Sequence, residues 1–143
     1  MAVTYENPAA LGAPMGKYSH LSRAGDLVMV AGQVGVRPDG SLAGDDVRSQ
    51  LLQVFENLRL ALESVGGGFE SVMKFTTYLV GEAAIAAFRH ARDELYPRIY
   101  SSGAYPPNTL IVVQGLVRPE FVLEIDAMAW VPASEASPRA PEM

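Results

Sequence analysis

The chain has 143 residues, of which 49% are hydrophobic, and its formal net charge is −5. This size and apolar content predict one globular domain with a sizeable core. The acidic balance and the scattered Lys and Arg residues argue against a nucleic-acid partner, because such binding depends on clustered cations. With no cysteine and two histidines, the chain excludes disulfides and thiolate chemistry and offers little for a metal site.

The ends of the chain differ in composition from its middle. Residues 1–16 are rich in Pro, Gly and Ala and predict an irregular lead-in. Residues 132–143 are rich in Pro, Ala, Ser and Glu and predict a disordered tail, so that 1–131 form the single domain. The N-terminus lacks a signal-peptide pattern, and no apolar run reaches membrane-spanning length. We therefore expect a cytoplasmic protein with no membrane partner.

The apolar pattern between these ends predicts the order β-β-α-β-α-β-β. The expected ranges are strands at 18–23 and 27–31, a helix at 47–65 capped by Asp45 or Asp46, a strand at 72–80, a helix at 82–96 ended or kinked by Pro97, and strands at 109–113 and 121–131. This order is typical of an α+β fold with one mixed sheet.

The last strand predicts an association between subunits. Its alternation places Leu123 and Ile125 on one face, and Glu124, Asp126 and Trp130 on the other. Two helices can cover only one face of the sheet. The second face, which mixes apolar side chains with carboxylates, is best explained by contact with other subunits.

The stretch from Tyr105 to Val113 is a rigid turn that leads into a strand. Pro106 and Pro107 fix the backbone, so Asn108 and Thr109 are presented where the strand begins. The pattern is compatible with turn chemistry alone. It is also compatible with a binding site, since polar groups on a rigid backbone make many such sites.

Four further side chains are candidates for chemistry, each with a second interpretation. Glu124 lies in an apolar strand and is either a general acid/base or an ion-paired carboxylate. Tyr18 either donates to a ligand or packs with its hydroxyl in water. Gln33 either positions a water molecule or caps backbone groups. Lys74 is more typical of a lysine with a buried stem than of a nucleophile.

Several segments together resemble the Rid family of reactive intermediate deaminases, also called the YjgF or endoribonuclease L-PSP-like family. They are GKYSH at 16–20, GDLVMVAGQ at 25–33, Asn57, VMKFTTYL at 72–79, YPPNTL at 105–110 and VLEIDAMA at 122–129. The resemblance implies a chorismate-mutase-like fold with two helices on one face of the sheet. It also implies a homotrimer with a central barrel and ligand clefts between subunits.

The resemblance further implies an activity. The family's deaminase branch hydrolyses reactive enamines and imines to ketoacids and ammonia without metal or cofactor. Its tyrosine and its water-placing glutamate match Tyr18 and Glu124, whereas its carboxylate-binding arginine is replaced by Asn108. Its cysteine and serine are replaced by Leu110 and Ala31. A neutral amide cannot reproduce a guanidinium–carboxylate contact, and losing that contact costs about 1.5–3 kcal/mol of binding.

We therefore expect hydrolysis of an enamine or imine other than simple 2-aminoacrylate to a carbonyl product and ammonia. The expected catalytic residues are Glu124 and Tyr18, and the expected substrate-binding residues are Asn108, Thr109, Tyr105, Gln33, Ala31 and Lys74. The expected partners are two further copies of the chain and a small molecule. The alternative is a non-catalytic small-ligand-binding or interaction trimer that retains the cleft.

Overall fold

The computed structural model describes residues 2–133. Its elements are β1 Thr4–Glu6, η1 Ala9–Leu11, β2 Leu21–Ala24, β3 Leu27–Val34, α1 Val47–Ser64, η2 Phe69–Ser71, β4 Val72–Val80, α2 Ala84–Ile99, β5 Asn108–Val113 and β6 Leu123–Trp130. The predicted tail at 132–143 lies outside the described residues from position 134 onward.

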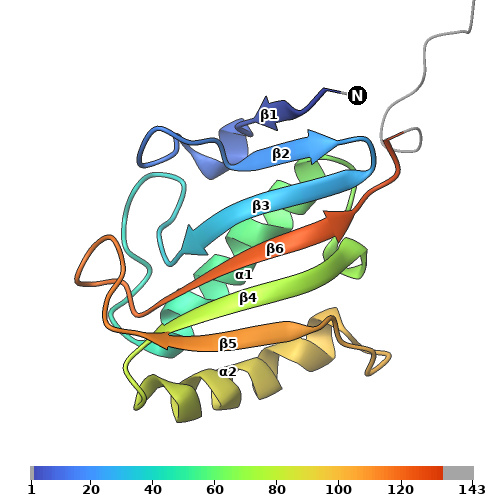
Figure 1. The fold of residues 1–143 in the computed structure, drawn as a ribbon. Helices are drawn as coiled ribbons and strands as arrows, with labels where there is room; N and C mark the ends of the chain where they lie inside the picture. The colour runs from blue at the N-terminus through green and yellow to red at the C-terminus, as the bar shows by residue number, and fades with distance from the viewer. Residues whose placement is uncertain (1, 134–143) are drawn as a thin grey trace, which may run out of the picture.

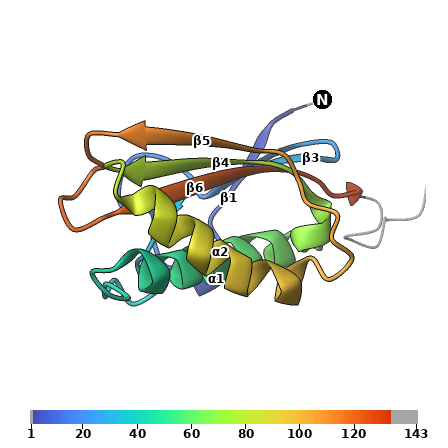
Figure 2. The same ribbon diagram turned by 90° about the horizontal axis from the view of Figure 1, so that it is seen from below.

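The strands form one mixed sheet in the order β1-β2-β3-β6-β4-β5. All neighbouring strands are antiparallel except β4 and β5, which are parallel and joined through α2. Both helices lie on one face of the sheet (Figures 1 and 2). The predicted α+β class and the two-helix layer are confirmed.

The N-terminal part of the prediction was wrong in two places. Thr4–Glu6 form an additional edge strand against β2, which three residues are too short to reveal by alternation. β2 begins at Leu21, so Tyr18 lies in the preceding loop, where its N–H donates to the carbonyl of Gly16. The last strand likewise begins later than predicted, at Leu123.

The first helix follows its sequence signals closely. Asp46 is the N-cap, and its side chain accepts a hydrogen bond from the N–H of Ser49 at 2.9 Å. At the other end Gly66 has φ +85°, and the N–H of Gly67 donates to the carbonyl of Leu62. Gly66 closes the helix in the left-handed region of backbone conformation, which a residue with a Cβ adopts only with strain.

The second helix continues through Pro97 to Ile99, past its predicted end. A proline removes one helical hydrogen bond, here the bond to the carbonyl of Asp93, and crowds that carbonyl. Asp93 is exposed, so water can satisfy the freed group. Pro97 stands only two residues before the helix ends, where few bonds remain to be lost.

The core lies between the helices and the sheet. Leu51, Leu58 and Leu62 of α1 and Leu79 and Leu123 of the sheet are all fully buried. On the opposite face the side chains are only partly covered by the described chain. Large apolar residues exposed there include Met29, Met73, Ile111 and Trp130.

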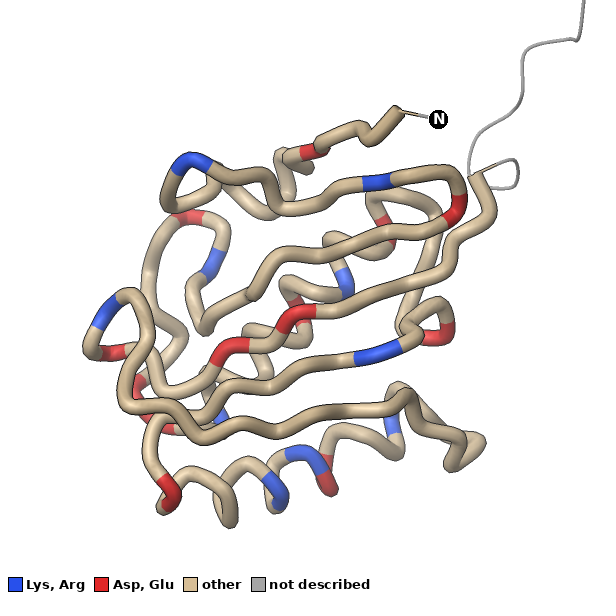
Figure 3. The backbone as a smooth tube through the Cα atoms, in the orientation of Figure 1, with Lys and Arg blue, Asp and Glu red and all other residues tan. Residues whose placement is uncertain are grey.

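Charge is distributed without a basic stripe. Lys and Arg positions are scattered over loops, strands and helices, whereas acidic positions stand near the middle of the sheet on β6 (Figure 3). Within the described part of the chain, neither helix is long and apolar enough to cross a membrane.

Candidate functional site

A bulge in β3 organises the candidate site. Val30 pairs with Ala127 and Gln33 pairs with Ile125, so two residues of β3, Ala31 and Gly32, face only Asp126 of β6. The extra residue reverses the alternation of β3. Gln33 is therefore turned toward the core face, and Gly32 is left beside the side chain of Glu124.

Glu124 lies on β6 between Val34 of β3 and Tyr78 of β4. Its side chain is half-buried, and no group of residues 2–133 donates a hydrogen bond to its carboxylate. Burial raises the pKa of Glu124, and the neighbouring negative charge of Asp126 raises it further. A carboxyl whose pKa is raised in this way holds a proton more readily than an exposed glutamate and is suited to exchanging protons with a substrate.

Gly32 is required for this position of the carboxylate. A Cβ at Gly32 would collide with the Glu124 carboxylate and approach its Cγ to 2.9 Å. Any larger residue would therefore push the carboxylate away. The absence of a side chain at position 32 is part of how the site is built.

Tyr18 faces the same space from the loop before β2. Its hydroxyl accepts a hydrogen bond from the N–H of Met15 at 3.3 Å, which leaves the phenolic proton available to a ligand. A cavity of about 440 Å³ lies between Tyr18 and Glu124, and we call it the outer cavity. It is lined by Met15, Gly16, Tyr18, Ala31, Gly32, Val34, Val117 and Glu124.

His20 and Gln33 form a buried network beside the outer cavity. The Gln33 amide donates to the carbonyl of Ala31 at 3.1 Å and to Nδ1 of His20 at 3.3 Å. His20 Nε2 then donates to the carbonyl of Gly12 at 3.1 Å. Both ring nitrogens are used internally. Of the two interpretations of Gln33, the structure favours backbone capping.

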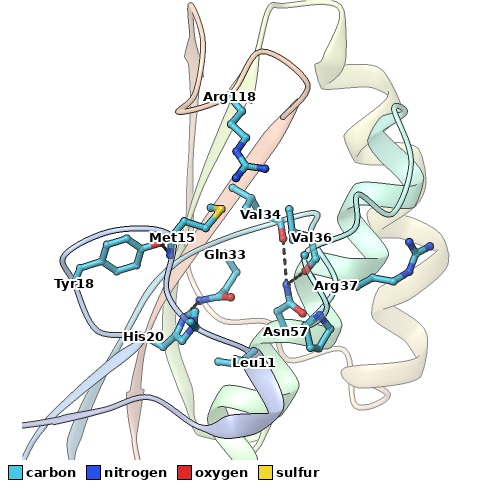
Figure 4. Close-up of a pocket in the computed structure, with 14 residues that line it drawn as sticks. Leu11, Met15, Tyr18, His20, Gln33, Val34, Val36, Arg37, Asn57 and Arg118 are labelled. Carbon is cyan, nitrogen blue, oxygen red and sulfur yellow. Dashed lines mark hydrogen bonds between the residues drawn. The ribbon is translucent and has the colours of Figure 1, made fainter.

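A second, smaller cavity of about 110 Å³ adjoins the first, and we call it the inner cavity (Figure 4). The two share Met15, Tyr18, Gly32 and Val34. Asn57 of α1 closes the inner cavity, and its amide donates to the carbonyls of Val34 and Val36 at 3.1 and 2.9 Å.

Tyr105 and Asn108 lie elsewhere in the single chain. Asn108 is on the edge strand β5, beside Phe75 and so on the side of the sheet that the helices cover. Its Oδ1 accepts a hydrogen bond from the Thr77 hydroxyl at 2.8 Å. Both residues line a separate cavity of about 410 Å³ against Tyr96 of α2. One chain therefore does not bring Asn108 together with Glu124.

Thr109 and Lys74 are on the open face of the sheet. Thr109 lies beside Thr76, and Lys74 lies opposite Met128. Neither lines the outer cavity. Among the predicted site residues, Tyr18, Ala31 and Glu124 line one cavity together, with Gln33 directly behind it.

The sequence reasoning did not identify Arg118 as a site residue. It lies in the loop between β5 and β6, it lines the inner cavity, and its guanidinium points into this cavity (Figure 4). Its closeness in sequence to Glu124 was the available signal. Within residues 2–133, no group of three or more His, Asp or Glu residues is arranged to hold a metal ion.

The α+β fold agrees with the Rid-type architecture that the sequence resemblance implies, and comparison with known proteins shows the family. Residues 8–131 match the family model described as Endoribonuclease L-PSP. The chain belongs to this family, also called the Rid or YjgF family.

Curated relatives match over most of their length. The RutC family protein YjgH of Escherichia coli is 32% identical over 117 residues, which cover 81% of this chain and 84% of that protein. A RutC family protein of Pyrococcus horikoshii is 30% identical over 118 residues, which cover 82% and 89% of the two chains.

Solved structures share the fold. RidA from the Antarctic bacterium Psychrobacter superposes with a TM-score of 0.77 at 26% identity, covering 87% of this chain and 97% of that one. Escherichia coli TdcF with bound serine superposes with a TM-score of 0.79 at 21% identity, covering 89% and 98%.

Proposed function

We propose that this protein hydrolyses a reactive enamine or imine to a carbonyl compound and ammonia, and that its substrate is not simple 2-aminoacrylate. The observation that carries the proposal is the pairing of Tyr18 and Glu124 across the outer cavity. The Glu124 carboxylate is half-buried and receives no hydrogen bond within residues 2–133, so it is available to water and substrate. Membership of the Rid family supports the reaction class.

The reaction follows from the chemistry of the C=N bond. Protonation of an enamine at carbon gives the iminium ion, which is the protonated imine. Glu124 takes a proton from water as the water oxygen adds to the iminium carbon, and the product is a neutral carbinolamine. The carboxyl then returns the proton to the amine nitrogen. As the C–N bond breaks, the hydroxyl proton passes back to the carboxylate, and ammonia leaves with the carbonyl product. Water is consumed, and no redox change occurs.

Tyr18 and backbone groups would orient the substrate for this addition. The phenolic proton of Tyr18 is free to donate toward the cavity because its oxygen accepts from the N–H of Met15. At the bulge, the N–H of Ala31 donates to the His20 carbonyl and the Ala31 carbonyl accepts from Gln33, so further backbone contacts would come from Gly32. Holding a substrate beside the carboxylate replaces an encounter in solution by a fixed geometry, which is a large source of rate enhancement.

A homotrimer with clefts between subunits completes the proposal. The open face of the sheet exposes Met29 by 43% and Trp130 by 53%, which is unusual for side chains of this kind without a partner. Assembly would also allow Thr109 on this face, and Asn108 and Tyr105 at the edge formed by β5, to approach the outer cavity of another subunit. The fine composition of the cleft depends on that assembly.

A second candidate is a non-catalytic trimer that binds a small ligand. Asn108 stands where the resemblance places an arginine, and a neutral amide is a weaker partner for a carboxylate. TdcF, which shares the fold, was crystallised with serine. The acidic net charge of −5 and the scattered basic residues argue against RNA as the ligand of either candidate.

The experiment is to generate imines in the presence of the protein and follow their decay. An amino-acid oxidase produces 2-imino acids from several amino acids in situ, and semicarbazide trapping reports the imine that remains. Faster loss of at least one imine in the presence of the wild type supports the enzyme. Unchanged decay of every imine, together with measurable binding of the ketoacids, supports the non-catalytic alternative.

A further inference from the structure

We propose that Arg118 binds an anionic group of the ligand, so that the protein selects small carboxylate-bearing molecules although position 108 is an asparagine. Binding of the anionic group by Arg118 does not depend on the proposed function. Any effect of Arg118 on imine hydrolysis rests on that function.

The first support is position. Arg118 lines the inner cavity together with Met15, Tyr18 and Gly32, and these three residues also line the outer cavity with Glu124. Figure 4 shows the guanidinium of Arg118 directed into this space toward Met15. One chain thus presents a cation, a phenol and a carboxylate around two cavities that share a wall.

The second support is the anchoring of the loop that carries Arg118. The N–H of Phe121 donates to the Arg118 carbonyl at 3.2 Å, and the guanidinium lies 5.7 Å from the centre of the buried Phe121 ring. Gln50 of α1 holds the next residues: its amide donates to the Glu120 carbonyl at 2.9 Å and accepts from the N–H of Val122 at 3.0 Å. Arg118 is exposed, but its backbone is fixed to the core.

The third support is that the Arg118 guanidinium has no ion-pair or hydrogen-bond partner within residues 2–133. No Asp or Glu oxygen of residues 2–133 lies within 4.0 Å of its guanidinium. Arg37, which also lines the inner cavity, differs: it donates to Ser41 and to the carbonyls of Leu42 and Ala43, and its side chain points away in Figure 4. In the part of the chain that the structure describes, Arg118 is therefore the arginine lining the inner cavity whose N–H donors are unpaired and face the cavity.

The chemistry fits a carboxylate. A guanidinium presents two parallel N–H donors that match the two oxygens of a carboxylate, which lysine or asparagine cannot do. A 2-imino acid held in this way would direct its carboxylate toward Arg118 and its C=N carbon toward Glu124. The ligand class is accordingly small 2-imino and 2-oxo acids, rather than neutral imines.

The test compares an acid with its neutral ester. Binding of 2-oxobutyrate and of methyl 2-oxobutyrate is measured by NMR titration on the wild type, Arg118→Ala and Arg118→Lys. We expect Arg118→Ala to weaken binding of the acid by about tenfold or more and to leave the ester unchanged. Arg118→Lys should recover part of the affinity for the acid, because the positive charge returns without the two parallel N–H donors of the guanidinium.

Two further variants complete the test. Arg89→Ala removes the same charge from an exposed position on α2 that lines none of the cavities described above, and it should leave acid binding unchanged. Arg92→Ala tests the competing cation, which lines the cavity beside Asn108. Loss of acid binding in Arg92→Ala but not in Arg118→Ala would overturn the inference. So would a wild type that fails to prefer the acid, or an equal loss of acid and ester in Arg118→Ala.

The two proposals fail in different ways. Selective acid binding through Arg118 without imine hydrolysis would contradict the proposed enzyme and leave this inference intact. Imine hydrolysis with no effect of Arg118→Ala on the preference for the acid over the ester would support the proposed enzyme and contradict this inference. Thermal unfolding of each variant shows whether a lost response reflects a lost fold.

Discussion

The Cα atom of Gly32 lies directly against the carboxylate of Glu124, leaving no room for a Cβ. This contact joins the bulge of β3 to the proposed water-placing group on β6. It means that the position of the carboxylate depends on a residue with no side chain. The relationship can be tested by adding one methyl group.

Gly32→Ala should displace the Glu124 carboxylate and lower kcat/KM by about tenfold to a hundredfold, since a shift near 1 Å in a reacting group has effects of this size. Steady-state kinetics on an accepted imine measures the loss. Gly115→Ala is the matched control, because a Cβ at Gly115 meets open space. Equal activity of Gly32→Ala and the wild type would refute the claim that the position of the Glu124 carboxylate depends on Gly32.

Glu124→Gln should change how stability depends on pH. Burial raises the pKa of Glu124 in the folded protein, so the fold binds this proton more tightly than the unfolded chain does. Ionisation therefore destabilises the wild type as pH rises from the ordinary glutamate pKa through the raised folded-state pKa. Denaturant unfolding should show Glu124→Gln gaining stability relative to the wild type across this window and no further above it. A constant difference at all pH values would contradict the raised pKa.

Gln50→Leu should loosen the loop that carries Arg118 and leads to Glu124. Gln50 is fully buried, and its amide makes three hydrogen bonds, to Gly44, Glu120 and Val122. Replacing Gln50 by leucine leaves these backbone groups without a hydrogen-bond partner and should lower the free energy of unfolding by about 2–4 kcal/mol.

The control for Gln50→Leu is Gln53→Leu on the same helix. The Gln53 side chain makes one bond, to Asn57, so its loss should cost about 1 kcal/mol. Urea unfolding of both variants measures the difference. Similar losses in the free energy of unfolding for the two variants would contradict the role of Gln50 as the anchor of the loop.

Assembly is expected to depend on the open face of the sheet. Native mass spectrometry should detect three chains for the wild type. Met29→Lys together with Trp130→Lys should give monomers, because two desolvated charges cannot be accommodated in an apolar interface. Ala87→Lys, on the exposed side of α2, should remain trimeric. A wild type that is monomeric at micromolar concentration would contradict the assembly.

Much of the fold could be predicted because its signals are local. The stripe of α1, the Asp46 cap and the glycines after Ser64 each act within a few residues. The three-residue strand β1 and the passage of α2 through Pro97 could not be predicted in this way. The first is fixed by pairing with β2, and the second by solvent access near the end of the helix.

The candidate site was less accessible to sequence reasoning because it depends on the bulge. Alternation along β3 does not reveal that Gln33 turns toward the core or that Gly32 meets Glu124. Arg118 comes close to Tyr18 only through the return of the chain from β5 to β6. Tyr18 and Glu124 were candidates from the sequence pattern and received their roles from the resemblance, whereas the position of the Arg118 guanidinium at the cavity follows only from the three-dimensional structure.

The most direct test of the central claim is imine decay with the wild type and with Glu124→Ala, at equal protein concentration and with folding verified by thermal unfolding. We expect the wild type to accelerate hydrolysis of at least one 2-imino acid and Glu124→Ala to match the rate without protein. Acceleration that survives in Glu124→Ala would contradict the assignment of Glu124 as the group that places and deprotonates water.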